Sequence, residues 1–165
     1  MNRTIAPGEL SGSFRAPASK SHAHRLLICA ALGRAPVTVF CDTFSDDILA
    51  TIDCLHAMGA GITINGSRIQ VTPISFENRE KGLCKLSCKE SGSTLRFLLP
   101  VVGALGLDAV FEMEGRLPER PLHPFDAVLI AHGMNIRKQG FELFVSGALQ
   151  PGTYNLPGNI SSQYL

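Results

Sequence analysis

The stretch Ala18-Ser19-Lys20-Ser21-His22-Ala23-His24-Arg25 opens an apolar run, Leu26-Leu27-Ile28-Cys29-Ala30-Ala31-Leu32. We expect a helix that begins near Lys20, because the hydroxyl of Ser19 or Ser21 can accept from the free N–H groups of a first turn. The helix dipole and the cations Lys20 and Arg25 would make this end electropositive. The stretch predicts either an anion site at a helix start or an ordinary capped helix with two solvated cations.

The same pattern, a polar start before an apolar run, occurs again further along the chain. The other two starts are Glu90-Ser91-Gly92-Ser93-Thr94-Leu95-Arg96 and Gly158-Asn159-Ile160-Ser161-Ser162-Gln163. Ser19, Ser91 and Ser161 are spaced 72 and 70 residues apart. A repeat at a nearly fixed period indicates repeated structural units. We therefore expect equivalent helix starts that converge on one ligand.

Length and composition restrict the class of protein. The 165 residues are 45% apolar and 18% charged, as in a globular domain with a sizeable core. A net charge of +1 favours neither nucleic acid nor a membrane surface as a partner. No apolar run reaches membrane-spanning length, and Met1-Asn2-Arg3-Thr4 lacks the apolar core of a signal peptide, so we expect a cytoplasmic protein. The five cysteines and five histidines lack metal-ligand spacing, which predicts buried or half-buried reduced thiols and no metal site.

Apolar periodicity and turn residues predict the secondary structure. The expected helices cover about Lys20–Leu32, Ser45–Met58, a segment starting at Ser91–Ser93, and about Pro124–His132. The expected strands are short ones around Arg3–Ala6 and Gly12–Ala16, a buried strand at Val37–Phe40, a hairpin of Ile62–Ile64 with Ile69–Val71, a strand around Leu86, a strand at Ala109–Met113, and a pair of Met134–Arg137 with Glu142–Val145. Each unit then has the α/β order strand, helix, strand, helix, strand, strand, over about residues 14–75 and 84–147. A third unit starts at about residue 150 and stops within its first turn, so we expect an N-terminal piece of a longer protein.

Four motifs in this order resemble one enzyme family, the 3-phosphoshikimate 1-carboxyvinyltransferases or 5-enolpyruvylshikimate-3-phosphate synthases. They are Ser19-Lys20-Ser21-x-x-x-Arg25, Ser91-Gly92-Ser93-Thr94-Leu95-Arg96, Pro118-Glu119-Arg120-Pro121 and Gly158-Asn159-Ile160-Ser161-Ser162-Gln163. The resemblance covers the whole chain. It implies a two-domain fold of repeated βαββαβ units around a pseudo-threefold axis in each domain. Residues 14–165 would be an incomplete first domain, and residues 1–13 would belong to or border the second.

The resemblance also implies an activity. The family transfers the enolpyruvyl group of phosphoenolpyruvate to the 5-hydroxyl of shikimate-3-phosphate and releases phosphate, on the shikimate pathway to chorismate and aromatic amino acids. It implies no metal or organic cofactor, two small-molecule substrates, and a monomer when full length. Further catalytic groups lie largely in the second domain of the family, so we expect this chain alone to be inactive.

The resemblance assigns candidate site residues to each of the two substrates. Those implied for shikimate-3-phosphate are Lys20, Ser21, Arg25, Ser161, Ser162 and Gln163. Those implied for phosphoenolpyruvate are Lys20, Gly92, Arg120 and Gln163, with Lys20 also catalytic, and Arg96 and Asp46 match further cleft positions. Plainer interpretations stay open: Gly92 as a tight turn, Arg120 paired with Glu119 or Asp126, Arg96 bracing its helix, and Asp46 as a first-turn helix charge.

Two positions depart from the family pattern, and two other functions compete. Ala23 stands where many relatives carry Ser, and Glu90 where an Asn is often seen. A related enolpyruvyl transferase acts on UDP-N-acetylglucosamine, but its first motif is usually Gly-x-Lys-Asn, unlike Ser19-Lys20-Ser21. A non-catalytic phosphate-binding module is the alternative from another class.

Overall fold

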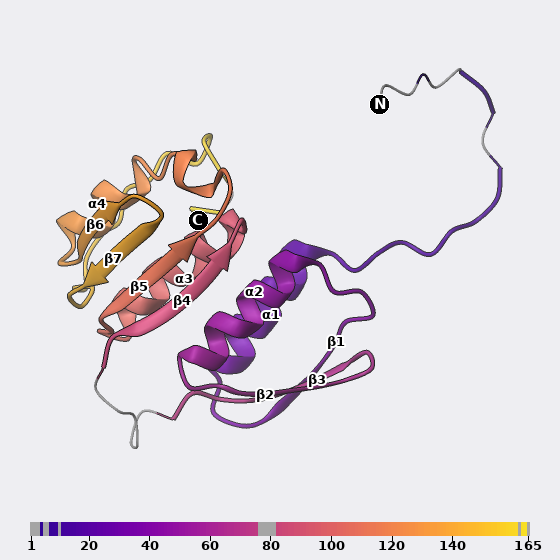
Figure 1. The fold of residues 1–165 in the computed structure, drawn as a ribbon, viewed down its shortest axis with the longest axis horizontal. Coiled ribbons are helices and arrows are strands. Elements are labelled where there is room, and N and C mark those ends of the chain that lie inside the picture. The colour runs from indigo at the N-terminus through magenta and orange to yellow at the C-terminus, as the bar shows by residue number, and fades with distance from the viewer. Residues whose placement is uncertain (1–3, 5–6, 10, 76–81, 162, 165) are drawn as a thin grey trace.

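The computed structural model describes residues 4, 7–9, 11–75, 82–161 and 163–164, which form two α/β halves (Figure 1). The elements of the first half are α1 (Lys20–Ala31), β1 (Val37–Phe40), α2 (Asp46–Ala57), β2 (Gly61–Asn65) and β3 (Arg68–Thr72). Those of the second half are β4 (Cys84–Lys89), α3 (Gly92–Ala104), β5 (Ala109–Met113), the 3-10 helix η1 (Leu117–Glu119), α4 (Phe125–Ala131), β6 (Asn135–Gln139) and β7 (Glu142–Ser146).

Each half contains one sheet. In the first, β3 lies between β1 and β2 and pairs antiparallel with both, so the predicted hairpin is confirmed. In the second, the order is β4-β5-β7-β6, with β4 and β5 parallel and the other pairs antiparallel. The helix α3 makes the crossover that a parallel pair requires. The predicted strands from Leu86 to Val145 are therefore confirmed.

Helix α2 joins the two halves into one core. The Cys54 thiol of α2 donates to the Ser87 carbonyl of β4 at 3.3 Å, and the Cys84 thiol of β4 donates to the Ala57 carbonyl at the same distance. Cys54 and Leu86 are fully buried at this junction, within a single apolar cluster that spans both halves. The polar helix starts of the two halves are thereby fixed relative to one another.

The three longer helices begin where the sequence predicts. The Ser19 hydroxyl accepts from the His22 amide at 3.4 Å, and Ser91 accepts from the Thr94 amide at 3.2 Å. Ser45 caps α2 in the same way, through the Ile48 amide at 3.4 Å. Each serine thus satisfies an amide that has no partner within its helix.

The starts of these helices lie at one end of the helix layer. On α1 and α2, Lys20 contacts Asp47 and His24 contacts Thr51, and both pairs are separated by 27 residues. This constant offset means that α1 and α2 run side by side in the same direction. Thr94, in the first turn of α3, contacts Thr51 and the Asp47 carbonyl, which brings the third start to the same end.

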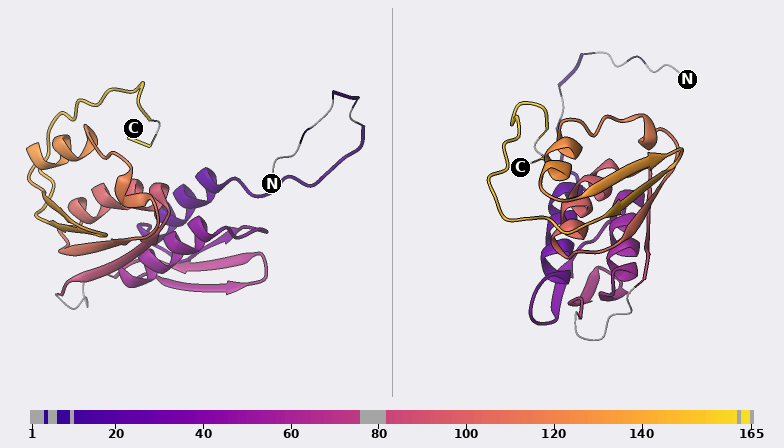
Figure 2. Two further views of the ribbon diagram at one scale, coloured as in Figure 1. Left: turned by 45° about the horizontal axis from the view of Figure 1, so that its top comes forward. Right: turned by 90° about the vertical axis from the view of Figure 1, so that its left-hand side faces the viewer.

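Two expectations in the N-terminal half differ from the structure, and a third is not tested. No strand forms at Gly12–Ala16. Arg15 pairs with the Asp42 carboxylate and the Ala18 amide donates to Thr43 Oγ1, so this segment is held through side chains and not by backbone pairing with a neighbouring strand. Residues leading into α1 extend away from the body instead (Figures 1 and 2). The strand expected at Arg3–Ala6 lies largely outside the described residues. Cys29 is exposed, because it lies on the outer side of α1, whereas the other four cysteines are buried as predicted.

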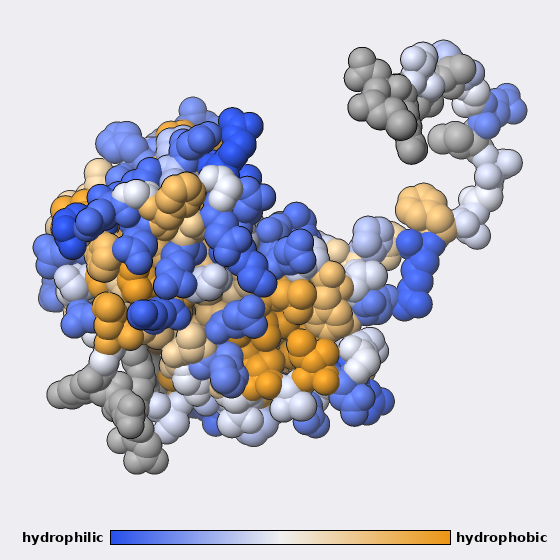
Figure 3. All heavy atoms as spheres, viewed as in Figure 1, coloured by the Kyte–Doolittle hydropathy of each residue, from blue (hydrophilic) through white to orange (hydrophobic). Residues whose placement is uncertain are grey.

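Strand β1 is formed but is not a buried strand. Only Val39 is buried, while Phe40 is 69% exposed and Val37 is 45% exposed. The reason is that β1 is an edge strand of a sheet whose helices cover one face. Figure 3 shows apolar surface on this side of the molecule, over the region of α1, α2 and β1.

The third polar start forms no helix among residues 158–161 and 163–164. Residues 158–160 form a turn, and the Ser161 hydroxyl accepts from the Gln163 amide at 3.2 Å. A single turn is costly to nucleate without the residues that would extend it.

Within the part of the chain that is described, no helix combines the length and apolarity needed to cross a bilayer.

Candidate active site at the helix starts

The starts of α1 and α3 carry no acidic residue in their first turns. Their free amides and dipoles therefore stay uncompensated by carboxylates of their own helix. The first turn of α2 differs, because it holds Asp46 and Asp47. This arrangement leaves two electropositive helix ends beside one acidic end.

Lys20 is held by α2. Its Nζ lies 2.7 Å from Asp47 Oδ2, and its side chain remains 57% exposed, so the ammonium is oriented but open to a ligand. The sequence singled out Asp46, whereas the structure brings its neighbour Asp47 to Lys20. The choice between adjacent carboxylates depends on the rotation of α2 against α1, and the sequence offers no local signal for it.

Gly92 lies beneath two guanidinium groups. A Cβ at this position would be 2.6 Å from Arg96 Nη1 and 3.1 Å from Arg120 Nη1. Arg96 also donates to the Gly92 carbonyl at 3.3 Å and to the Pro121 carbonyl at 3.1 Å. Arg96 therefore braces its own helix, as one interpretation held, and at the same time joins α3 to the loop that carries Arg120. The glycine leaves space for both cations above the helix start.

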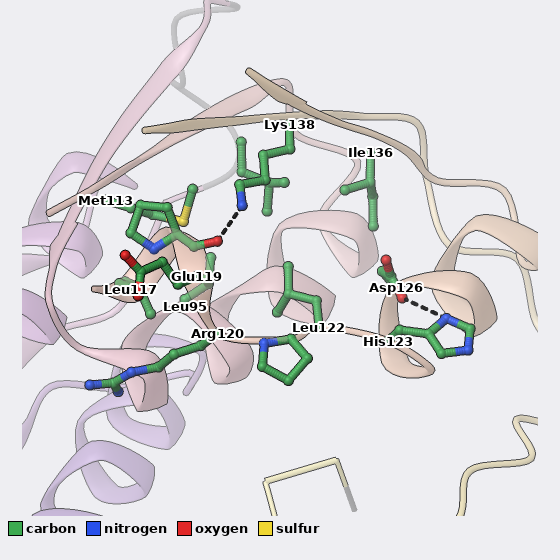
Figure 4. A pocket seen from close by; sticks show the side chains of 13 residues that line it. Leu95, Met113, Leu117, Glu119, Arg120, Leu122, His123, Asp126, Ile136 and Lys138 are labelled. Atoms are coloured by element: carbon green, nitrogen blue, oxygen red, sulfur yellow. Dashed lines mark hydrogen bonds and ion pairs between the residues drawn. The ribbon is translucent and has the colours of Figure 1, made fainter. Parts of the chain in front are cut away.

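Arg120 is turned toward the helix starts. Figure 4 shows its side chain pointing out of a neighbouring pocket of about 320 Å³ and toward the helices of the first half. The nearby carboxylates have other partners: Glu119 pairs with Arg116 at 3.3 Å and Asp126 with His123 at 3.6 Å. The alternative in which one of them pairs with Arg120 is thus not seen.

Gln163 reaches the same place from the end of the chain. Its Nε2 donates to Ser93 Oγ in the first turn of α3 at 2.7 Å. Gln163, Arg96 and Arg25 also line one mostly apolar pocket of about 410 Å³. Arg25 stacks over the Phe97 ring at 4.6 Å and donates to the Ser21 carbonyl at 3.0 Å.

Seven of the ten sequence-predicted site residues are thus linked by contacts around the helix starts. They are Lys20, Ser21, Arg25, Gly92, Arg96, Arg120 and Gln163. Ser161 lies next to Gln163 through its capping bond, and Asp46 is exposed at the start of α2. Ser162 lies outside the described residues.

A buried polar chain that the sequence did not predict connects the three helices. His24 Nδ1 lies 2.7 Å from Thr51 Oγ1, which lies 2.7 Å from Thr94 Oγ1, and Thr94 contacts Ser91 Oγ at 2.7 Å. His24 is 1% exposed and both threonines are fully buried. A polar position on the buried face of each helix was the available signal, but it does not reveal which residues meet.

The bonding pattern of this chain defines the tautomer of His24. The Thr94 hydroxyl donates to Ser91 Oγ at 2.7 Å or to the Asp47 carbonyl at 3.3 Å. With its single proton on either acceptor, Thr51 donates to Thr94 and His24 Nδ1–H donates to Thr51. The Nε2 atom is then bare, and it has no hydrogen-bond partner among the described residues. Burial lowers the pKa of His24 below its ordinary value of 6.5, and Lys20 and Arg25 act in the same direction against the opposing charge of Asp47.

The described residues contain no group of three His, Cys, Asp or Glu side chains that could hold a metal ion. The side chains at the helix starts are instead cations, hydroxyls and an amide. Such donors match phosphate and carboxylate oxygens. The site is therefore suited to small anions.

Comparisons with known proteins agree with this chemistry. Residues 5–165 match the family described as EPSP synthase (3-phosphoshikimate 1-carboxyvinyltransferase). A 3-phosphoshikimate 1-carboxyvinyltransferase from Clostridium beijerinckii is 40% identical over 99% of this chain and 39% of the relative, and one from Clostridium botulinum is 37% identical over 98% and 38%. The chain thus spans less than two fifths of the length of these curated relatives.

A solved structure supports the fold independently. The EPSP synthase from Acinetobacter baumannii matches with a TM-score of 0.77 at 22% identity, over 93% of this chain and 36% of that chain. The match confirms the predicted α/β fold class. The chain covers only part of the solved structure, in agreement with the expectation of an incomplete domain. The chain belongs to the EPSP synthase (3-phosphoshikimate 1-carboxyvinyltransferase) family.

Proposed function

We propose that the full-length protein transfers the enolpyruvyl group of phosphoenolpyruvate to the 5-hydroxyl of shikimate-3-phosphate and releases phosphate. The observation that carries this proposal is the convergence of Lys20, Gly92, Arg120 and Gln163 on the helix starts. Two highly charged anions need several cations and many hydrogen-bond donors in one place. The family membership of residues 5–165 supplies the reaction class.

The residues divide between the two substrates in this proposal. Ser21, Arg25 and the serines Ser161 and Ser162 bind shikimate-3-phosphate, the hydroxyls donating to its phosphate. Gly92 and Arg120 bind phosphoenolpyruvate, since the glycine lets backbone amides approach an anion. Lys20 and Gln163 contact both substrates.

The chemical step in this proposal is the addition and elimination that the family resemblance implies. The 5-hydroxyl loses its proton to a base as its oxygen forms a bond to C2 of phosphoenolpyruvate, while C3 gains a proton from an acid, giving a tetrahedral intermediate. That intermediate then loses phosphate and a proton from C3 to give the enol ether. Lys20, oriented by Asp47 at 2.7 Å, stabilises the negative charge carried by the phosphate as it leaves.

Further properties belong to the same proposal. The acid and base of the reaction come from the part of the full-length protein beyond this chain. The enzyme is a cytoplasmic monomer that uses no metal or organic cofactor. Residues 14–165 are part of its first domain, and residues 1–13 border the second.

The test is a product assay on the full-length protein. Phosphate release is measured with phosphoenolpyruvate plus shikimate-3-phosphate, and the product is identified by its mass. Turnover on the order of 1 per second or faster supports the proposal. Turnover only with UDP-N-acetylglucosamine would assign the sister reaction, and binding of both anions without product would make the protein a phosphate-binding module.

A further inference from the structure

The loop that carries Arg120 is held from outside by three side chains. This loop, residues 115–121 and here called the Arg120 loop, connects β5 to α4. Glu90 Oε1 accepts from the Arg116 amide at 3.1 Å, Lys138 Nζ donates to the Pro118 carbonyl, and Arg96 donates to the Pro121 carbonyl at 3.1 Å. These contacts are distributed along the loop, from its first residues to its last.

Lys138 reaches the loop from the inner face of the second sheet. Side chains two apart on a strand share a face, so Lys138 lies on the same face of β6 as Ile136. Both line the pocket of about 320 Å³ under the Arg120 loop, where Figure 4 shows Lys138 extending to the loop backbone. Arg137, between them, stacks over Phe144 on the other face at 5.0 Å. Lys138 is exposed, and its ammonium nevertheless donates to the Pro118 carbonyl of the loop.

Glu90 holds the other end. Gly115 has φ of +52°, and a Cβ there would lie 1.4 Å from Glu90 Oε1, so the loop can approach the carboxylate only with glycine at this position. The bond from the Arg116 amide is charge-assisted, because a carboxylate accepts it. Glu90 is one of the two departures from the family motif, and this contact gives the Glu90 carboxylate a structural role.

The position of Arg120 explains why such anchoring matters. Arg96 Nη1 and Arg120 Nη1 both lie within about 3 Å of one point above Gly92. Two like charges repel when no anion lies between them. A mobile loop would relieve this repulsion by moving Arg120 away, and the freedom gained would have to be lost again on ligand binding.

We propose that Lys138 and Glu90 are positioning residues, which hold the Arg120 loop so that the Arg120 guanidinium stays beside Gly92 before phosphoenolpyruvate binds. This inference rests on the proposed function, in which Arg120 binds that substrate. Neither residue contacts substrate, and both act through the loop backbone.

The test is steady-state kinetics on the full-length protein. Lys138→Met keeps the length of the side chain and removes the donor, and it should raise the KM for phosphoenolpyruvate by about tenfold. The KM for shikimate-3-phosphate should stay unchanged, and Lys138→Arg should restore most of the affinity. Lys85→Met is the matched control: Lys85 is an exposed lysine on β4, away from the loop, and its loss should change neither KM. Glu90→Ala and Glu90→Gln form a second, independent pair. Glu90→Ala should raise the KM for phosphoenolpyruvate, whereas Glu90→Gln, which keeps an acceptor oxygen, should retain most of the affinity.

A double-mutant cycle separates positioning from a general structural effect. In an Arg120→Ala background, Lys138→Met should cause no further loss, because the group that it positions is gone. An equal loss in both backgrounds, or an equal rise of KM for both substrates, would overturn the inference. If Arg120→Ala weakens phosphoenolpyruvate while Lys138→Met and Glu90→Ala do not, the inference fails and the proposed function stands. If Arg120→Ala itself has no effect on phosphoenolpyruvate, the assignment of Arg120 fails.

Discussion

Arg120 and Lys20 illustrate how single side chains would make the proposed anion site from ordinary helix starts. Lys20 is oriented by Asp47 of α2, whereas Arg120 is placed by the loop that carries it, which Arg96 joins to α3. The cost of ordering a long side chain is thus met during folding, before a ligand arrives. Substitutions at these residues should therefore change ligand affinity more than stability.

Arg120→Ala in the full-length protein should weaken phosphoenolpyruvate more than shikimate-3-phosphate. A charge-assisted contact contributes about 1.5–3 kcal/mol, so the loss should be about ten- to a hundredfold. Calorimetric titration with each substrate measures it. Arg116→Ala is the control, because Arg116 lies on the same loop and pairs with Glu119 at the surface. Equal weakening of both substrates by Arg120→Ala would contradict the assignment.

Gly92→Ala should separate affinity from stability at one position. The added methyl would meet Arg96 and Arg120 at their flexible guanidinium ends, so the side chains can move aside at little cost to folding. Moving them displaces the cations from the helix start. We expect a thermal midpoint close to wild type and a higher KM for phosphoenolpyruvate, with Gly140→Ala as a control in an open turn where nothing lies near the added Cβ. Because Gly140 has φ of +59°, that control should lose stability without loss of affinity.

At the scale of elements, the sequence predicts the starts of helices better than their partners. Ser19, Ser45 and Ser91 cap α1, α2 and α3 as expected, because capping depends on residues three apart in the chain. The strand at Gly12–Ala16 fails because a strand needs a neighbour, and local pattern does not supply one. The same reason explains why Asp47 and the chain from His24 to Ser91 went unpredicted: they depend on how α1, α2 and α3 pack.

His24 should make the stability of the helix layer sensitive to acid. Its pKa is lowered by burial in the folded protein, so below pH 6.5 the unfolded chain binds the proton more readily. Stability should therefore fall as the pH drops through 6.5 toward the lowered value, and this contribution should be constant above 6.5. Urea unfolding at a series of pH values measures the effect.

His24→Asn removes the titrating group and should flatten this part of the pH profile. His22→Asn, at an exposed position on the same helix, should keep the profile of the wild type. Identical acid sensitivity in wild type and His24→Asn would rule out His24 as the cause.

At the scale of the whole molecule, we expect the chain to carry one side of the proposed binding site. Both the cations and the third polar start lie within it, yet the chain spans only 39% of the length of a relative that is 40% identical. The four motifs therefore indicated the family and the repeat indicated the helix starts, but neither could supply contacts made by residues beyond the chain. These contacts include the groups proposed to move protons in the reaction.

The 165-residue chain by itself should not catalyse the transfer. The reason is that the proposed acid and base belong to the remainder of the full-length protein. Phosphate release is assayed with both substrates and with the purified chain at high concentration. Turnover at an enzymatic rate, on the order of 1–1000 per second, would show that the chain contains a complete site.

The most direct test of the account is amide shift mapping of the chain by NMR, with each substrate added separately. The account predicts that shikimate-3-phosphate binds weakly and shifts the amides of Lys20–Arg25 and those near Gln163. Phosphoenolpyruvate alone should cause almost no shift, because further cations proposed to bind it lie in the rest of the full-length protein. Added salt should weaken the phosphate contact, because the helix starts are open to solvent. Shifts with phosphoenolpyruvate alone, or shifts with shikimate-3-phosphate that leave Lys20–Arg25 unaffected, would contradict it.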